Sequence, residues 1–174
     1  MASQPHNVNR TFYRAPWSRQ LQLLTLLCSV ILLGISFALL LHTPAEAPAI
    51  YQLGIWIPLL TLVLSAVFAV RGYQLEDQHL YIVRPGWRSR LCLAQLQAVT
   101  VDSAAMDGSI RLFGNGGLFA YLGLFRNSKL GRYRAYATDT ARSVVLHLPT
   151  QTVVVTPDNP SEFARQAEKS IAMG

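Results

Sequence analysis

The sequence predicts a two-helix transmembrane hairpin followed by a mainly-β barrel or sandwich that a C-terminal α-helix caps. Three observations support this fold class. The 174-residue chain is 51% hydrophobic and only 14% charged, whereas an ordinary soluble domain has about 25% charged residues. The apolar residues are concentrated in two uncharged runs of 21 residues each, 21–41 and 50–70. After residue 70, short apolar stretches alternate with turn residues, which is typical of β-structure.

The two apolar runs are long enough to cross a bilayer as helices. At about 1.5 Å per residue each would extend roughly 31 Å, which matches a hydrocarbon core of about 30 Å. Only residues 42–49 join them, and so short a connection makes the helices antiparallel neighbours. Ala45-Glu46-Ala47 resembles a signal-peptide cleavage site. However, the first run exceeds the roughly 7–15 residues of a signal-peptide core, so we expect it to be retained.

The charges around the hairpin predict its orientation. Arginines stand before the first run and after the second, and residues 42–49 contain no Lys or Arg. Because basic flanks stay in the cytoplasm, we expect both termini there and the link outside. Neither run contains a charged residue or a histidine, which indicates an anchor rather than a transport pathway. The flanking arginines are Arg10, Arg14, Arg19, Arg71, Arg84, Arg88 and Arg90.

Residues 71–174 are expected to form a cytoplasmic domain of short strands. We expect strands at residues 73–76, 79–84, 87–93, 96–101, 110–113, 133–137, 144–148 and 153–155, with Pro85-Gly86 as a turn. Their close spacing favours an antiparallel sandwich or barrel.

A helix is expected to close this domain. Asn159 can cap it, Pro160 is tolerated at the first helical position, and Glu162 stands at the third. Phe163, Ala167 and further apolar residues then recur at helical spacing, so one face of the helix should pack on the sheet.

Five segments of this domain carry a family resemblance. They are LFGNGGLF at 112–119, GLFR at 123–126, LGRYRAYAT at 130–138, VVL at 144–146 and TPDNPSEF at 156–163. Together with two preceding membrane helices, they resemble the bacterial pleckstrin-homology (PH) domain membrane protein family. The resemblance implies a PH-like barrel or sandwich at the membrane. It implies no reaction and no particular lipid, because a fold does not define a function.

The glycine-rich stretch at residues 114–117 does not predict a nucleotide site. A phosphate-binding loop needs a Gly-Lys-Ser/Thr ending before a helix, and Leu118-Phe119-Ala120 follows here instead. The stretch is more typical of a turn or bulge with positive φ angles. A contact loop is the second interpretation, in which Phe119 and Tyr121 belong to an apolar surface for a partner.

A basic cluster is the clearest candidate binding site. It consists of Arg126, Lys129, Arg132 and Arg134, and Arg132 and Arg134 would share one face of a strand. Each such residue near an anionic leaflet contributes about 1 kcal/mol. An ordinary solvated face is the alternative interpretation. The candidate lipid- or partner-binding residues are therefore Arg126, Lys129, Arg132, Arg134, Phe119 and Tyr121.

The sequence gives no indication of catalysis. The four histidines are widely separated, the two cysteines cannot form a four-thiolate metal site, and no carboxylate pair stands out. We therefore expect no enzyme, no catalytic residues, no metal and no cofactor. The net charge of +6 is explained by membrane topology, and no nucleic-acid recognition motif accompanies it.

These observations predict a membrane-anchored PH-like binding or scaffolding module of the bacterial inner (plasma) membrane. Its expected partners are the lipid bilayer, anionic lipid head groups and an unidentified protein, with no nucleic acid. The alternative is an accessory subunit of a larger transport or sensory assembly. The expected boundaries are 1–20 for a cytoplasmic segment, 21–41 and 50–70 for the helices, 42–49 for the external loop, and 71–174 for the cytoplasmic domain.

Overall fold

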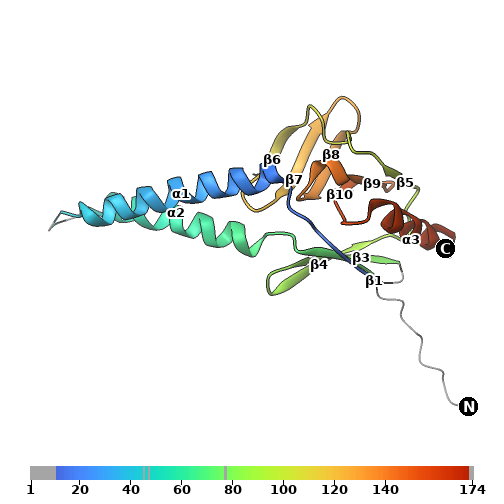
Figure 1. Cartoon of the computed structure of the whole chain (residues 1–174), viewed down its shortest axis with the longest axis horizontal. Coiled ribbons are helices and arrows are strands. Elements are labelled where there is room, and N and C mark those ends of the chain that lie inside the picture. The colour runs from blue at the N-terminus through green and yellow to red at the C-terminus, as the bar shows by residue number, and fades with distance from the viewer. Residues whose placement is uncertain (1–10, 45, 47, 77, 173–174) are drawn as a thin grey trace, which may run out of the picture.

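Two long apolar helices project as a hairpin from a β-rich domain (Figure 1). The structure is a computed structural model that describes residues 11–172 except 45, 47 and 77. Helix α1 spans Arg19–Leu41 and α2 spans Ala49–Val67, close to the runs expected from the sequence. Ala45 and Ala47 of the cleavage-like motif lie outside the described residues.

Two serine side chains stabilise the hairpin, and most of its apolar surface is not covered by the protein. The Ser18 hydroxyl caps α1 by accepting a hydrogen bond from Leu21 N at 3.1 Å. The buried Ser36 hydroxyl in α1 donates to Ile55 O in α2 at 3.0 Å. Only 11% of the spanning window of α1 and 6% of that of α2 is buried inside the protein. Neither helix is therefore the core helix of a soluble domain.

The domain consists of two sheets and a C-terminal helix. The first sheet has the order β1-β2-β3-β4, and the second has the order β5-β9-β10-β8-β7-β6. Strand β10 is parallel to β8, and the other strand pairs are antiparallel. The described elements form an open two-sheet sandwich rather than a closed barrel. This architecture confirms the expected fold class and decides between its two forms.

The first sheet contains β1 (Thr11–Arg14), β2 (Gly72–Glu76), β3 (His79–Arg84) and β4 (Trp87–Cys92). The second contains β5 (Ala98–Val101), β6 (Ile110–Gly116), β7 (Tyr121–Asn127), β8 (Gly131–Ala137), β9 (Val144–His147) and β10 (Thr152–Val155). A 3₁₀ turn, η1, covers Thr140–Arg142, and helix α3 covers Pro160–Ala172.

Each expected strand overlaps an observed one, but the sequence did not predict β1 or β7. Strand β7 is not apparent in the sequence because Gly123 and the glycine-rich stretch before it look like turn residues. Gly123 in β7 faces Gly114 in β6, and both have positive φ angles, +121° and +108°. A Cβ on Gly114 would clash with the carbonyl oxygen of Leu122. The glycine pair therefore lets the two strands approach closely, rather than ending them.

The main core lies between the two sheets and α3. Phe163 of α3 is fully buried, and its ring packs edge-on against Tyr13 at 5.2 Å and Tyr73 at 6.2 Å between centroids. Ala164 and Ala167 of α3 are buried too, as their spacing predicted. A smaller cluster, including Phe125 and Tyr133, covers the opposite face of the six-stranded sheet.

Strand β1 comes from the segment before the first helix. Tyr13 pairs with Tyr73 of β2, so the hairpin is inserted between two adjacent strands of one sheet. The segment that follows β1 is also held: Ala15 N donates to Arg71 O at 3.1 Å, and Thr138 Oγ1 donates to Pro16 O at 2.8 Å. The sequence predicts a separate N-terminal segment for residues 1–20 and does not indicate this strand.

The two core tyrosines provide a test of this packing. The Tyr73 hydroxyl donates to Tyr136 O and accepts from Thr156 N at 3.1 Å, and burial raises its pKa to about 12. Among the described residues, the buried Tyr13 hydroxyl has no hydrogen-bond partner. We expect Tyr73→Phe to lower the free energy of unfolding by about 1–3 kcal/mol, and Tyr13→Phe to leave it unchanged or raise it by up to about 1 kcal/mol. Chemical denaturation of the detergent-solubilised chain measures both. An equal loss in the two variants would contradict the assignment.

Candidate functional site

The loop between β6 and β7, residues 117–120, is fixed to the base of α1. The buried Thr25 hydroxyl donates to Gly117 O at 3.3 Å and accepts from Phe119 N at 3.0 Å. Gly117 has a φ of +128° and lies against Leu24, so a side chain there would be strained. The positive φ angles expected for the glycine-rich stretch are found at Gly114 and Gly117. Only Gly117 belongs to the turn, because residues 114–116 lie in β6. The loop therefore contacts the protein's own helix α1.

A buried arginine joins the end of α2 to both sheets. Arg84 is only 7% exposed, and its guanidinium lies over the rings of Trp87 at 4.3 Å, Phe68 at 5.5 Å and Tyr136 at 5.7 Å. Burial lowers the pKa of Arg84. Trp87 Nε1 also donates to Val67 O in the last turn of α2 at 3.1 Å. The bases of both helices are therefore attached to the domain.

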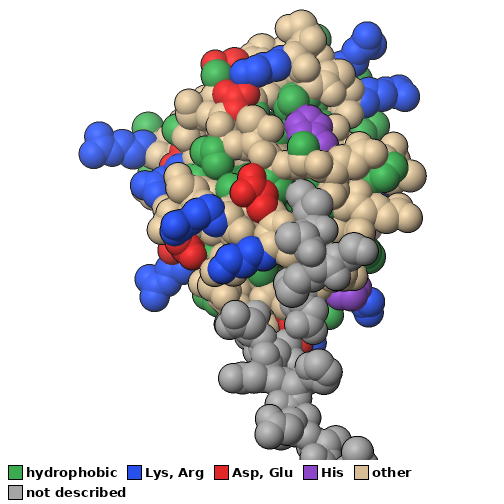
Figure 2. Space-filling model, turned by 90° about the vertical axis from the view of Figure 1, so that its right-hand side faces the viewer, with side chains coloured by type: hydrophobic (Ala, Val, Ile, Leu, Met, Phe, Trp, Pro, Cys, Tyr) green, Lys and Arg blue, Asp and Glu red, His purple; other side chains and the backbone are tan. Residues whose placement is uncertain are grey.

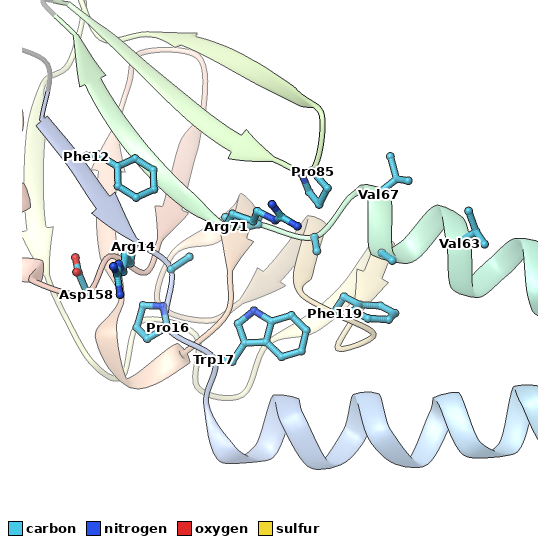
Figure 3. A pocket seen from close by; sticks show the side chains of 14 residues that line it. Phe12, Arg14, Pro16, Trp17, Val63, Val67, Arg71, Pro85, Phe119 and Asp158 are labelled. Carbon is cyan, nitrogen blue, oxygen red and sulfur yellow. The ribbon is translucent and has the colours of Figure 1, made fainter.

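A cavity of about 990 Å³ lies between the helix bases and the domain (Figure 3). We call it the interfacial cavity. Trp17 and Phe119 lie on one side, with ring centroids 6.0 Å apart, and Val63 and Val67 of α2 lie on another. Its polar lining comes from Arg14, Arg71 and Asp158.

Three of the expected basic residues gather on one strand face. Arg126 of β7 is directly opposite Arg132 of β8, and Leu124 is opposite Arg134. On the edge strand β6, Ile110 is opposite Arg126 and Phe113 is opposite Leu124. Directly paired residues point to the same side of a sheet. We call this surface the arginine face; it consists of Ile110, Phe113, Arg126, Arg132 and Arg134.

The arginine face combines charge with exposed apolar surface. Ile110 is 70% exposed and Phe113 is 79% exposed, although both belong to residue types that are usually buried. The sequence missed these two residues because a register shift between Arg111 and Phe113 interrupts the strand alternation.

The other three candidate residues lie elsewhere. Lys129 forms an ion pair with Asp102, and this contact lowers the pKa of the Asp102 carboxyl group. Tyr121 is half-buried and packs against the smaller core cluster, and burial raises its pKa. Phe119 lines the interfacial cavity. The structure therefore brings together Arg126, Arg132 and Arg134, and separates them from Lys129, Tyr121 and Phe119.

The far end of the domain has a different surface. Figure 2 views the end opposite the hairpin and shows mixed Lys, Arg, Asp and Glu side chains with only small hydrophobic areas. Within the described residues, no group of three or more His, Cys, Asp or Glu side chains is arranged to hold a metal ion. The candidate sites that the described residues offer are the arginine face and the interfacial cavity.

A comparison with known protein families matches the β-rich domain. Residues 71–171, more than half of the chain, match a family described as a bacterial PH domain, which confirms the resemblance noted in the sequence. The match begins after α2, so it includes β2–β10 but neither β1 nor the hairpin. The chain matches no curated protein and no solved structure.

The contact between the loop and α1 can be tested at Thr25. We expect Thr25→Val to remove both loop hydrogen bonds, to speed hydrogen exchange of the Phe119 amide, and to lower the free energy of unfolding by about 1–2 kcal/mol. Thr61→Val is the matched control, because the exposed Thr61 hydroxyl bonds only within its own helix, to Ile57 O at 2.8 Å. Unchanged exchange at Phe119 in Thr25→Val would show that this contact does not hold the loop.

Proposed function

The chain belongs to the bacterial PH domain family, and we propose that it is a membrane-anchored binding module at the cytoplasmic face of the bacterial inner membrane. In this proposal, the arginine face recognises an acidic protein partner. The observation that carries the proposal is the insertion of the hairpin between β1 and β2. It holds the domain, and with it the arginine face, in one orientation next to the bilayer.

The membrane anchor is supported by the helices themselves. Both are long and apolar enough to cross a bilayer, and little of either is buried in the protein. Because β1 and β2 are neighbours in one sheet, both ends of the hairpin lie on the same side of the membrane. The arginines near these ends favour the cytoplasmic side. Cleavage after α1 would remove β1 and the buried Tyr13, so we infer that α1 stays in the mature protein.

An acidic partner is supported by the composition of the arginine face. Arg126 and Arg132 face each other directly across β7 and β8, and opposed like charges are unfavourable unless an anion lies between them. In the part of the chain that the structure describes, none of the three arginines forms an ion pair with a carboxylate. Arginine and exposed aromatic side chains are the residues that contribute most at protein interfaces, and Phe113 supplies the aromatic ring.

The proposed mechanism is confinement followed by recognition, without a chemical step. Two helices keep the domain at the membrane surface, which raises its effective concentration near a partner in the same membrane. Complementary charge on the partner speeds encounter and sets the orientation of docking. This role agrees with the binding chemistry of both candidate sites and with the PH domain family.

Photo-cross-linking in cells tests the arginine face. With benzoylphenylalanine in place of Phe113 in the full chain, we expect one cross-linked protein species, reduced about tenfold or more by Arg132→Glu with Arg134→Glu. The same probe at the exposed Lys169 on α3 should not capture this species. The matched charge control is Arg165→Glu with Lys169→Glu, which should leave the Phe113 adduct intact. Adducts with lipid alone, or a protein adduct insensitive to the arginine changes, would overturn the proposal.

An accessory-subunit role is the second candidate, and the hairpin surface favours it. A groove of about 460 Å³ on the hairpin is lined by Leu33, Gly34, Phe37 and Leu59, among others. Nothing lies within 4 Å of the position that a Cβ on Gly34 would take. An open groove at a glycine suits close packing by a helix of another membrane protein.

Purification in mild detergent distinguishes the two candidates. If the chain is a subunit, it should elute in a defined complex, and Gly34→Leu should release it by filling the groove, whereas Arg132→Glu with Arg134→Glu should not. Gly54→Leu is unsuitable as a control, because Gly54 faces Leu39 inside the hairpin; Thr61→Leu, on an exposed position of α2, is the better one. A chain that elutes without any protein partner would reject the subunit role.

A further inference from the structure

We propose that the interfacial cavity binds one anionic phospholipid, with its phosphate group attracted by the positive charge of Arg14 and Arg71 in the cavity lining and an acyl chain lying along the end of α2. This site rests on the proposed membrane anchor, but it is separate from the arginine face and does not depend on the function proposed for that face. It rests on the depth, the shape and the charge of the cavity.

The depth of the cavity matches the head-group region. Its wall is formed by the segment that enters α1 and the segment that leaves α2, including Arg14, Trp17, Ala69 and Arg71. These residues are adjacent to Arg19 and Val67, where the two helices begin and end. Tryptophan and arginine are the residues that anchor proteins at the membrane–water interface.

The shape of the cavity results from the divergence of the two helices. They are hydrogen-bonded to each other far from the domain, where Tyr51 of α2 donates to Leu39 O of α1 at 2.9 Å. Toward the domain they separate (Figure 1). The loop at 117–120 fills part of the space between their bases, and the cavity is the remainder (Figure 3). The side of the cavity that α2 forms consists of Val63, Ala66 and Val67. An apolar opening beside a bilayer is filled more favourably by an acyl chain than by water.

The charge of the cavity is complementary to a phosphodiester. Two arginines and one aspartate line it, which leaves one net positive charge. Both arginines are held by their backbones: Arg14 O accepts from Asp158 N at 2.9 Å, and Arg71 N donates to Val83 O at 2.9 Å. Among the described residues, neither guanidinium group forms an ion pair. A lipid with a single net negative charge neutralises the site, whereas a zwitterionic lipid does not.

Native mass spectrometry of the full chain in mild detergent tests the proposal. We expect phosphatidylglycerol to bind in one copy and to bind more tightly than phosphatidylcholine with the same acyl chains. Removing two positive charges from the cavity, at about 1 kcal/mol each, corresponds to about 30-fold weaker binding of phosphatidylglycerol in Arg14→Gln with Arg71→Gln. Arg132→Gln with Arg134→Gln removes the same charge outside the cavity and should bind like the wild type. Inorganic phosphate should not displace the lipid, because it cannot occupy the apolar wall.

A second variant separates lipid binding from folding. Ala66→Phe leaves both arginines in place and fills the apolar part of the cavity, so it should also weaken phosphatidylglycerol binding. In the wild type, phosphatidylglycerol should raise the unfolding temperature, and both cavity variants should lose this increase. Equal binding of the two lipids, displacement by phosphate, or an equal loss in the Arg132 and Arg134 control would each overturn the proposal. None of these results bears on the Phe113 cross-link, so the two proposals fail separately.

Discussion

The pairing of β1 with β2 is the constraint on which the rest of the structure depends. The chain leaves the first sheet at Arg14, forms two long helices, and returns to the same sheet at Gly72, directly opposite the point of departure. A flexible linker would have let the domain rotate about its anchor. Here each end of the hairpin continues through a short segment into a strand of the same sheet. The hydrogen bonds between these two antiparallel strands therefore fix the domain relative to the helices.

The contacts at the helix bases extend this constraint. Thr25 attaches α1 to the loop at 117–120, and the aromatic rings around Arg84 attach α2 to both sheets. Arg84 forms no ion pair with a carboxylate among the residues that the structure describes. Burying such an arginine is costly, and stacking on three rings offsets part of that cost. The interfacial cavity lies between these two attachments. Its walls are therefore held in place by the fold.

Much of the architecture could be predicted from the sequence because its signals are local. Length and apolar composition identify the hairpin, alternation and turn residues locate most strands, and Asn159-Pro160 marks the start of α3. Strand β1 gives no such signal, because its partner lies beyond the whole hairpin. The candidate site was predicted only in part for the same reason. Arg126 and Arg132 meet through a short hairpin, whereas Phe113 joins them across a register shift. Arg14 and Arg71 line one cavity because β1 pairs with β2 across the whole hairpin.

If the hairpin crosses the membrane as proposed, the placement of Tyr13 couples the folding of the domain to membrane insertion during synthesis. Tyr13 is made before either helix, and its core neighbours Tyr73 and Phe163 are made after both. If one helix failed to insert, β1 and β2 would end on opposite sides of the bilayer and the sheet could not be completed. The core would then remain open on one side, exposing apolar surface of the kind that quality-control proteases and chaperones act on. In the proposed membrane-anchored chain, both helices must therefore insert before the strand that carries Tyr13 can complete the core.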